Sequence, residues 1–338
     1  MNRKQRRTAA KTAKTAGKSG ASAGSIADKV VQKAIQAARA GAMAEAEAAL
    51  DEVLARHPEH VEALHHKGMI LARGDRIEQG IALLKRVVAA KSDEPLYWNN
   101  LAAAELTVNR PAEALPALQN AVRLDPGYVM AWQNLAMTFG DLGRPREQAE
   151  ALGKVVALAP AAADHWNQLG LAQINAGDQA AAESALRQAV ARNQSNAEYL
   201  SNLGVLLAQR GQIKDALPHL ARSLEIDPDR FTAALHFGVG LAADGDHAQG
   251  LRWLRRATSI QPKSDLAWGA LADTAIMAGE KAEALDAAKR AAMIDPANDS
   301  HRQRLAKLQG QPAAPSPLTT AAAEPTDLST RLDQIFIR

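Results

Sequence analysis

The chain has 338 residues, of which 47% are hydrophobic and 4% aromatic, and its formal net charge is +3. It contains no cysteine, which excludes disulfides, thiolate metal sites and a cysteine nucleophile. Abundant Ala, Leu, Glu, Gln and Arg, with few runs of Val, Ile or Thr, favour helix over sheet, so we expect an all-α protein. No apolar run approaches the roughly 18 residues of a membrane span and no secretory signal is apparent, which favours a cytoplasmic location.

The positive charge is concentrated at the N-terminal end. Residues 1–26 contain seven basic residues and no acidic one, and the rest of the chain has 33 basic and 37 acidic residues. This segment has no periodic apolar face, so we predict a disordered basic tail. It would either serve only as a solubilising tail or make weak contact with nucleic acid or an anionic membrane.

From residue 27 onward the sequence repeats itself at an interval of 34 residues. One series consists of Trp98, Trp132, Trp166, Leu200, Ala234 and Trp268. A second series consists of Pro58, Pro126, Pro160, Pro228, Pro262 and Pro296, with Ser92 and Gln194 in the two gaps. A third consists of Gly41, Asn109, Gly143, Gly177, Gly211, Gly245 and Gly279, with Asp75 after Gly74 in the second repeat.

Each series has a mechanical reason. Apolar residues between the tryptophan and the glycine have helical spacing, as in Trp132, Leu135 and Phe139, which predicts one amphipathic helix. Glycine or asparagine supplies the left-handed residue that ends this helix. A second helix follows, as over residues 112–123, and ends before the proline. Such a pair cannot bury its apolar face alone, so successive pairs must stack into a solenoid in which the tryptophans are packing anchors.

A 34-residue helix-turn-helix unit with Trp at position 4, Leu-Gly or Leu-Ala at positions 7 and 8, Ala at 20 and Pro at 32 resembles the tetratricopeptide repeat. We predict an array over residues 27–308, in which the last segment, near residues 299–308, is a capping helix. The eight repeats would start at residues 27, 61, 95, 129, 163, 197, 231 and 265. The resemblance implies a right-handed superhelical solenoid whose inner wall is formed by the first helix of each pair.

Positions 5 and 6 of these first helices are polar and mostly uncharged from the second repeat to the sixth. They are His65 and His66, Asn99 and Asn100, Gln133 and Asn134, Asn167 and Gln168, and Ser201 and Asn202. With the tryptophan directed into the stack, both positions lie on other faces of the helix, and the resemblance to the tetratricopeptide repeat implies that they face the groove. An amide offers an acceptor and two donors, so a row of them would bind an extended backbone. The alternative is a solvated helix surface, although Glu and Lys are better helix formers for that purpose.

This row is similar to the asparagine ladder in the repeats of the O-linked N-acetylglucosamine transferases, where position 6 is Asn. Asn100, Asn134 and Asn202 match that position. The family's other groove chemistry, a clamp for a C-terminal carboxylate, uses Lys or Arg at positions 2, 5 or 6, and this chain has none there. The predicted peptide-binding groove, including two adaptable methionines, comprises His65, His66, Asn99, Asn100, Gln133, Asn134, Asn167, Gln168, Asn202, Met69 and Met137.

Residues 57–66 (HPEHVEALHH) hold four of the nine histidines. His57 and His60 flank a predicted turn, while His65 and His66 point in different helical directions, so we predict no metal site. Phosphate loops and nucleophile–base pairs are not apparent. We therefore expect no enzyme, no cofactor and no small-molecule substrate.

The end of the chain has a different composition. Residues 309–326 form a predicted linker rich in Pro, Ala and Thr. In residues 327–338, Leu328, Leu332, Ile335 and Phe336 fall on one helical stripe, which predicts a short docking segment. This segment would bind a second protein or fold back into the groove as a competitor.

The expected function is a non-catalytic scaffold that binds an extended segment of a protein partner in the groove. Two alternatives stay open from the sequence. One is a basic-tailed adaptor that tethers complexes to RNA or an anionic membrane. The other is a regulatory or substrate-recruiting subunit of a separate transferase.

Overall fold

The computed structural model describes residues 26–311. The basic tail lies outside this range except for Ile26, and so do most of the predicted linker and the whole docking segment at residues 327–338. Within the described range all regular secondary structure is helical, which confirms the all-α prediction.

The described residues fall into two compact units, which divide between Leu158 and Ala159. The first unit contains a helix over residues 26–39, α2 (Met43–Arg56), α3 (Val61–Arg73), α4 (Ile77–Ala90), α5 (Pro95–Thr107), α6 (Pro111–Leu124), α7 (Val129–Asp141) and α8 (Pro145–Leu158). The second contains α9 (Ala163–Asn175), α10 (Gln179–Arg192), α11 (Ala197–Gln209), α12 (Ile213–Ile226), α13 (Phe231–Ala243), α14 (His247–Ile260), α15 (Asp265–Met277), α16 (Lys281–Ile294) and α17 (Asp299–Leu308).

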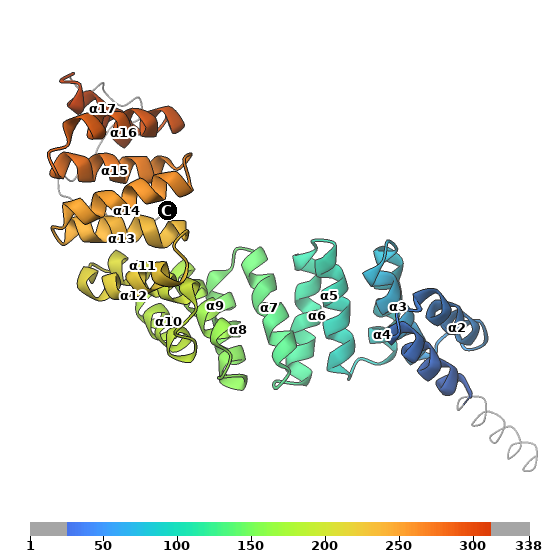
Figure 1. Cartoon of the computed structure of the whole chain (residues 1–338). Coiled ribbons are helices and arrows are strands. Elements are labelled where there is room, and N and C mark those ends of the chain that lie inside the picture. The colour runs from blue at the N-terminus through green and yellow to red at the C-terminus, as the bar shows by residue number, and fades with distance from the viewer. Residues whose placement is uncertain (1–25, 312–338) are drawn as a thin grey trace, which may run out of the picture. The chain divides into compact units, whose positions relative to one another are not determined.

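Within each unit, consecutive helices pair and the pairs stack on one another (Figure 1). In the first unit α3 packs against α4, and it also contacts α5, the first helix of the next pair. The same arrangement recurs in the second unit for α11, α12 and α13. The array ends with α17, which packs on α16. The predicted succession of helix-turn-helix repeats with a capping helix is thus confirmed.

The turn inside most pairs depends on one left-handed residue. Gly41, Gly143, Gly177, Gly211, Gly245 and Gly279 have positive φ, and Asn109 takes the same conformation with φ 56°. The second repeat differs from this pattern, because Gly74 has φ −101° and α3 ends there without a left-handed residue. Residues 74 and 75 still form a turn before α4, but neither Gly74 nor Asp75 has the left-handed conformation of the other turn residues.

The core of the repeats is built around a leucine in every second helix from α2 to α14. This series, which also keeps the 34-residue interval, consists of Leu50, Leu84, Leu118, Leu152, Leu186, Leu220 and Leu254. All seven are almost completely buried. Where position 8 is glycine, the leucine lies directly against it: a Cβ on Gly170 would come within 2.6 Å of Leu186. Replacing such a leucine by alanine would cost about 2–5 kcal/mol.

The tryptophan and proline series are joined by a hydrogen bond. Each indole N–H donates to the carbonyl oxygen six residues earlier at 2.9 Å, from Trp98 to Ser92, Trp132 to Pro126, Trp166 to Pro160 and Trp268 to Pro262. The tryptophans are only half-buried, so they anchor the loop between repeats as well as packing in the stack. On α17, Arg302 has the equivalent place and donates to the Pro296 carbonyl at 3.0 Å.

Within residues 26–311, none of the helices combines the length and the apolar character that a bilayer crossing requires.

Candidate functional site: amide pairs and a cationic cavity

The polar residues at positions 5 and 6 form hydrogen-bonded pairs between successive repeats. The position-6 amide of one repeat donates to the position-5 side chain of the repeat before it, 35 residues earlier. The three amide pairs are Asn100 Nδ2 to His65 Nε2 at 2.8 Å, Asn134 Nδ2 to Asn99 Oδ1 at 2.9 Å, and Asn202 Nδ2 to Asn167 Oδ1 at 2.9 Å. The first two lie in the first unit and the third lies in the second.

The expectation that both positions face the groove does not hold for three of the position-5 residues. His65, Asn99 and Asn167 are 6%, 2% and 5% exposed, so they lie inside the stack. The reason is the packing of each first helix against the first helix of the following repeat, which covers the face on which position 5 lies. Little of these three side chains is therefore open to a bound chain, and their hydrogen bonds hold the position-6 amides in place.

The position-6 side chains remain accessible. Asn100, Asn134 and Asn202 are half-buried, and Gln168 is exposed. After donating one N–H, each paired asparagine still has its carbonyl oxygen and a second N–H. In the part of the chain that the structure describes, no hydrogen bond is formed by those remaining groups. Each amide is thus oriented by a buried partner and retains a donor and an acceptor.

The other predicted groove residues have varied surroundings. His66, Met69 and Gln133 are half-buried, and Met137 on α7 is 50% exposed. Of all the predicted residues, His65, His66, Met69 and Asn100 are brought together, because they line one cavity in the first unit. The remaining residues lie elsewhere along the two units.

This cavity has a volume of about 670 Å³, is open to solvent on one side, and is lined by the helix over residues 26–39, α2, α3, the turn that follows α3, and Asn100 on α5. Its apolar lining includes Ile35, Met43, Met69 and Ile70. The volume lies within the range of about 300–1,000 Å³ that is typical of ligand pockets. A cavity of this size and lining can accommodate aliphatic side chains of a partner.

The charged lining of the cavity is mainly basic. Arg76 forms a bidentate pair with Glu47, with nitrogen–oxygen distances of 2.7 and 2.5 Å, and this pairing lowers the pKa of Glu47. Arg39 and Arg73 also line the cavity, and neither forms an ion pair or a hydrogen bond with another side chain among residues 26–311. With one carboxylate against three guanidinium groups, the lining has an excess of two positive charges.

The two histidines add no charge at neutral pH. Burial, with a smaller contribution from His66, lowers the pKa of His65 to about 4. Burial also lowers the pKa of His66, and the charge of Arg39 adds to this effect against the opposing charge of Glu62. The ring of His65 lies against Tyr97, with ring centres 4.7 Å apart, and its neutral Nε2 accepts the hydrogen bond from Asn100.

The two free arginines were missed from the sequence, although a signal was present. Arg39 and Arg73 are 34 residues apart, and each occupies position 13 of its repeat, near the end of the first helix. The carboxylate clamp of the family uses Lys or Arg at positions 2, 5 and 6, so a cation at position 13 is not predicted to bind a partner. Position 13 becomes relevant only when the end of the first helix is seen to line a cavity.

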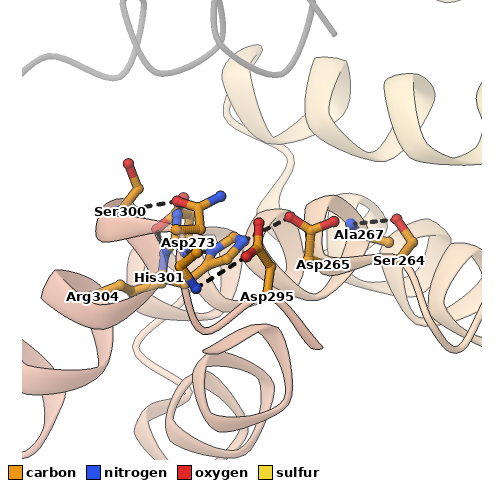
Figure 2. A network of polar contacts seen from close by, with 10 residues as sticks. Ser264, Asp265, Ala267, Asp273, Asp295, Ser300, His301 and Arg304 are labelled. Carbon is orange, nitrogen blue, oxygen red and sulfur yellow. Dashed lines mark hydrogen bonds and ion pairs between the residues drawn. The ribbon is translucent and has the colours of Figure 1, made fainter. Parts of the chain in front are cut away.

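The second unit ends in a polar network between α15 and α17, which we call the cap network (Figure 2). His301 Nε2 bonds the Asp265 carboxylate at 2.9 Å, and Arg304 forms two 2.7 Å hydrogen bonds with Asp273. Arg304 also contacts His301 Nδ1 at 2.9 Å. A Cβ on Gly269 would come within 3.1 Å of the His301 ring, so a larger residue would require the ring to shift by a few tenths of an ångström.

The histidine-rich stretch has structural roles. His60 Nδ1 accepts a hydrogen bond from the Ala63 N–H at the start of α3, and its Nε2 lies 3.1 Å from Asp28. Among residues 26–311, no group of three His, Cys, Asp or Glu residues is arranged to hold a metal ion.

Comparison with known proteins identifies the repeat. Family models described as tetratricopeptide repeat match residues 37–104, 99–163 and 167–231, which together make up more than half of the chain. Anaphase-promoting complex subunit 7 of Mus musculus is 37% identical over 81 residues, which is 24% of this chain and 14% of that protein. The human subunit is 35% identical over the same length. The chain therefore corresponds to a small part of these curated relatives.

Solved structures share the fold at low sequence identity. The C-terminal part of a repeat-containing protein from Cytophaga hutchinsonii matches with a TM-score of 0.57 and 15% identity, covering 71% of this chain and 99% of that one. A chain of the Naa15/Naa10 complex bound to HypK-THB matches with a TM-score of 0.54 and 17% identity, covering 83% of this chain and 44% of that one. These likenesses concern the architecture of the stacked helix pairs.

Proposed function

Because this chain belongs to the tetratricopeptide repeat family, whose members are protein–protein interaction scaffolds, we propose that it binds an extended segment of a partner protein through its position-6 amides. In the first unit the binding amides are Asn100 and Asn134, and in the second they are Gln168 and Asn202. The cytoplasmic location and the adaptor role expected from the sequence belong to this proposal.

One observation carries the proposal. The same inter-repeat hydrogen bond, 2.8–2.9 Å long, orients the half-buried side chains of Asn100, Asn134 and Asn202 and leaves one donor and one acceptor of each amide unused. An extended peptide presents alternating N–H and C=O groups, which such amides can pair with. A binder whose side chains are already fixed loses less conformational entropy on binding, so pre-organisation raises affinity.

The expected affinity follows from the number of hydrogen bonds. Each net bond contributes about 0.5–1.5 kcal/mol, and each position-6 amide offers two. The two position-6 amides of one unit therefore supply up to about 2–6 kcal/mol, which, after the cost of ordering a peptide, supports weak binding and a short-lived complex. Recognition of the main chain alone gives little sequence preference, so selectivity requires a further contact.

The proposal is tested by selecting binders from a displayed library of random unstructured peptides on the full-length protein. The affinity of the selected peptides is then measured by fluorescence anisotropy. We expect Asn100→Ala with Asn134→Ala to weaken peptides that bind the first unit by about thirtyfold or more, since up to four hydrogen bonds of about 0.5–1.5 kcal/mol each are lost. Unchanged affinity would reject the amides as the binding groups.

Gln168 offers the cleanest comparison, because its side chain is exposed and the substitution leaves no buried partner unpaired. Gln168→Ala should weaken peptides that bind the second unit. The matched control is Gln119→Ala, which removes an exposed amide from α6, a second helix of its pair. The control should leave peptide affinity unchanged.

A further inference from the structure

We infer that the cavity of the first unit selects partner segments in which Asp or Glu side chains alternate with aliphatic ones, and that Arg39 and Arg73 bind the carboxylates. This inference rests on the proposed function, because it assigns the partner chemistry of the same surface. It supplies the selective contact that the amides lack.

Charge complementarity is the first step of the argument. Arg39 and Arg73 are exposed and form no ion pair with another residue among 26–311, whereas Arg76 is neutralised by Glu47. Unpaired guanidinium groups at the rim of a cavity are suited to carboxylates, which they can bind through two parallel hydrogen bonds. The neutral histidines inside the cavity leave this positive excess unchanged at pH 7.

The apolar lining is the second step. Ile35, Met43, Met69 and Ile70 present flexible aliphatic surface, and Met43 is 43% exposed in spite of its apolar side chain. Burying aliphatic carbon of a partner against these residues gains about 25 cal/mol per Å². Methionines adapt to side chains of different shape, so the aliphatic residues of the partner need not be identical.

Continuity with the amide pairs is the third step. His65 and Asn100 both line the cavity, and they form the first amide pair. A chain that hydrogen-bonds Asn134 and Asn100 in succession would reach the cavity next. The two arginines occupy the same position in consecutive repeats, which suits carboxylates on a single extended strand. Protein is favoured over nucleic acid as the occupant because the apolar lining is aliphatic, whereas base recognition uses aromatic platforms.

The test uses the same peptide library on the full-length protein and on Arg39→Gln with Arg73→Gln. Peptides selected on the unaltered protein should be enriched in Asp and Glu next to Leu, Ile, Val or Met, and the acidic enrichment should disappear on the double variant. For the best peptide, replacing Asp by Asn and Glu by Gln should weaken binding about tenfold at low salt and much less at high salt.

The matched control is Lys33→Gln with Arg56→Gln. It removes the same charge from exposed positions on the helix over residues 26–39 and on α2 that do not line the cavity. The control should retain the acidic preference. If it loses that preference to the same extent as the arginine variant, general surface charge and not the cavity is responsible, and the inference is overturned.

The outcomes separate the inference from the proposed function. Peptides that depend on Asn100 and Asn134 but show no acidic enrichment would overturn the inference and leave the proposed function standing. A library that yields no binder at all would overturn both. A single-stranded RNA oligonucleotide or a synthetic peptide of residues 327–338 that displaces the acidic peptide at lower concentration would identify a different occupant and overturn the inference.

Discussion

The amide pairs and the cap network both involve position 6 of one repeat and position 5 of the repeat before it, but one uses neutral groups and the other charged groups. In the amide pairs, position 6 of one repeat reaches back to a buried polar side chain at position 5 of the repeat before it. At the cap, position 6 is Arg304, and position 5 of the preceding repeat is Gly269, which leaves room for Arg304 to reach Asp273. Neutral amides connect repeats and keep an accessible face for a partner, while charged groups close the end of the stack.

The difference has an energetic reason. An amide pair buries no net charge, so it can be repeated without a large desolvation penalty. A buried ion pair is expensive to desolvate and becomes destabilising when one partner is lost. The cap network therefore fixes α17 in one place, and the amide pairs maintain the spacing of α3, α5 and α7.

The largest expected effect comes from breaking the cap network. Arg304→Ala removes the guanidinium group that forms two hydrogen bonds with the Asp273 carboxylate, whose side chain is 14% exposed. We expect the free energy of unfolding to fall by about 3 kcal/mol in urea titrations followed by circular dichroism. Arg222→Ala, which removes an exposed pair with Glu225 on α12, should change it by less than about 1 kcal/mol. Equal effects would show that the cap network has no special role.

Acid should separate the histidine-containing amide pair from the all-asparagine pairs. The pKa of His65 is about 4 in the folded protein and about 6.5 in an unfolded chain. The unfolded state therefore binds more protons between these values, and the stability from neutral His65 is complete above pH 6.5 and lost as the pH falls towards 4. The loss approaches about 3 kcal/mol.

The measurement for this prediction compares unfolding of the protein and of His65→Asn at pH 7.5 and pH 4.5. His65→Asn converts the pair with Asn100 into an amide–amide pair, so its loss of stability in acid should be smaller. Acid loss of the same size in both proteins would show that protonation of His65 is not responsible.

An amide pair should tolerate removal of both partners better than removal of one. Asn134→Ala leaves the buried Oδ1 of Asn99 without a hydrogen bond and should cost about 1–3 kcal/mol. Asn99→Leu with Asn134→Leu replaces both amides by apolar groups of similar size and should restore most of that stability while peptide binding stays impaired. A double variant as unstable as the sum of the single variants would contradict the pairing.

The smallest effect concerns the glycine that admits the cap network. A Cβ on Gly269 would come within 3.1 Å of His301 and 3.4 Å of Arg304, so Gly269→Ala should destabilise the fold by about 1–2 kcal/mol. A Cβ on Gly153 of α8 would meet no atom within 4 Å, so Gly153→Ala should stabilise the fold by about 0.5–1 kcal/mol. Thermal unfolding would show shifts of opposite sign, and shifts of the same sign would contradict the packing argument.

The sequence by itself determined the repeat, its period and its turns. These features depend on local chemistry, because a glycine after an amphipathic stretch and a proline before the next one set helix ends without reference to distant residues. The special place of positions 5 and 6 was also visible from the row of amides.

Only the tertiary structure decided what those amides contact. Periodicity places Asn99 and Asn100 on neighbouring directions of one helix, but the next repeat determines that Asn99 is buried and Asn100 accessible. The tertiary structure likewise places Arg39, Arg73, His66 and Met69 in the lining of one cavity. Burial and hydrogen-bond pairing depend on how successive helices approach one another, and that geometry is a property of packed side chains and not of the spacing within any one helix.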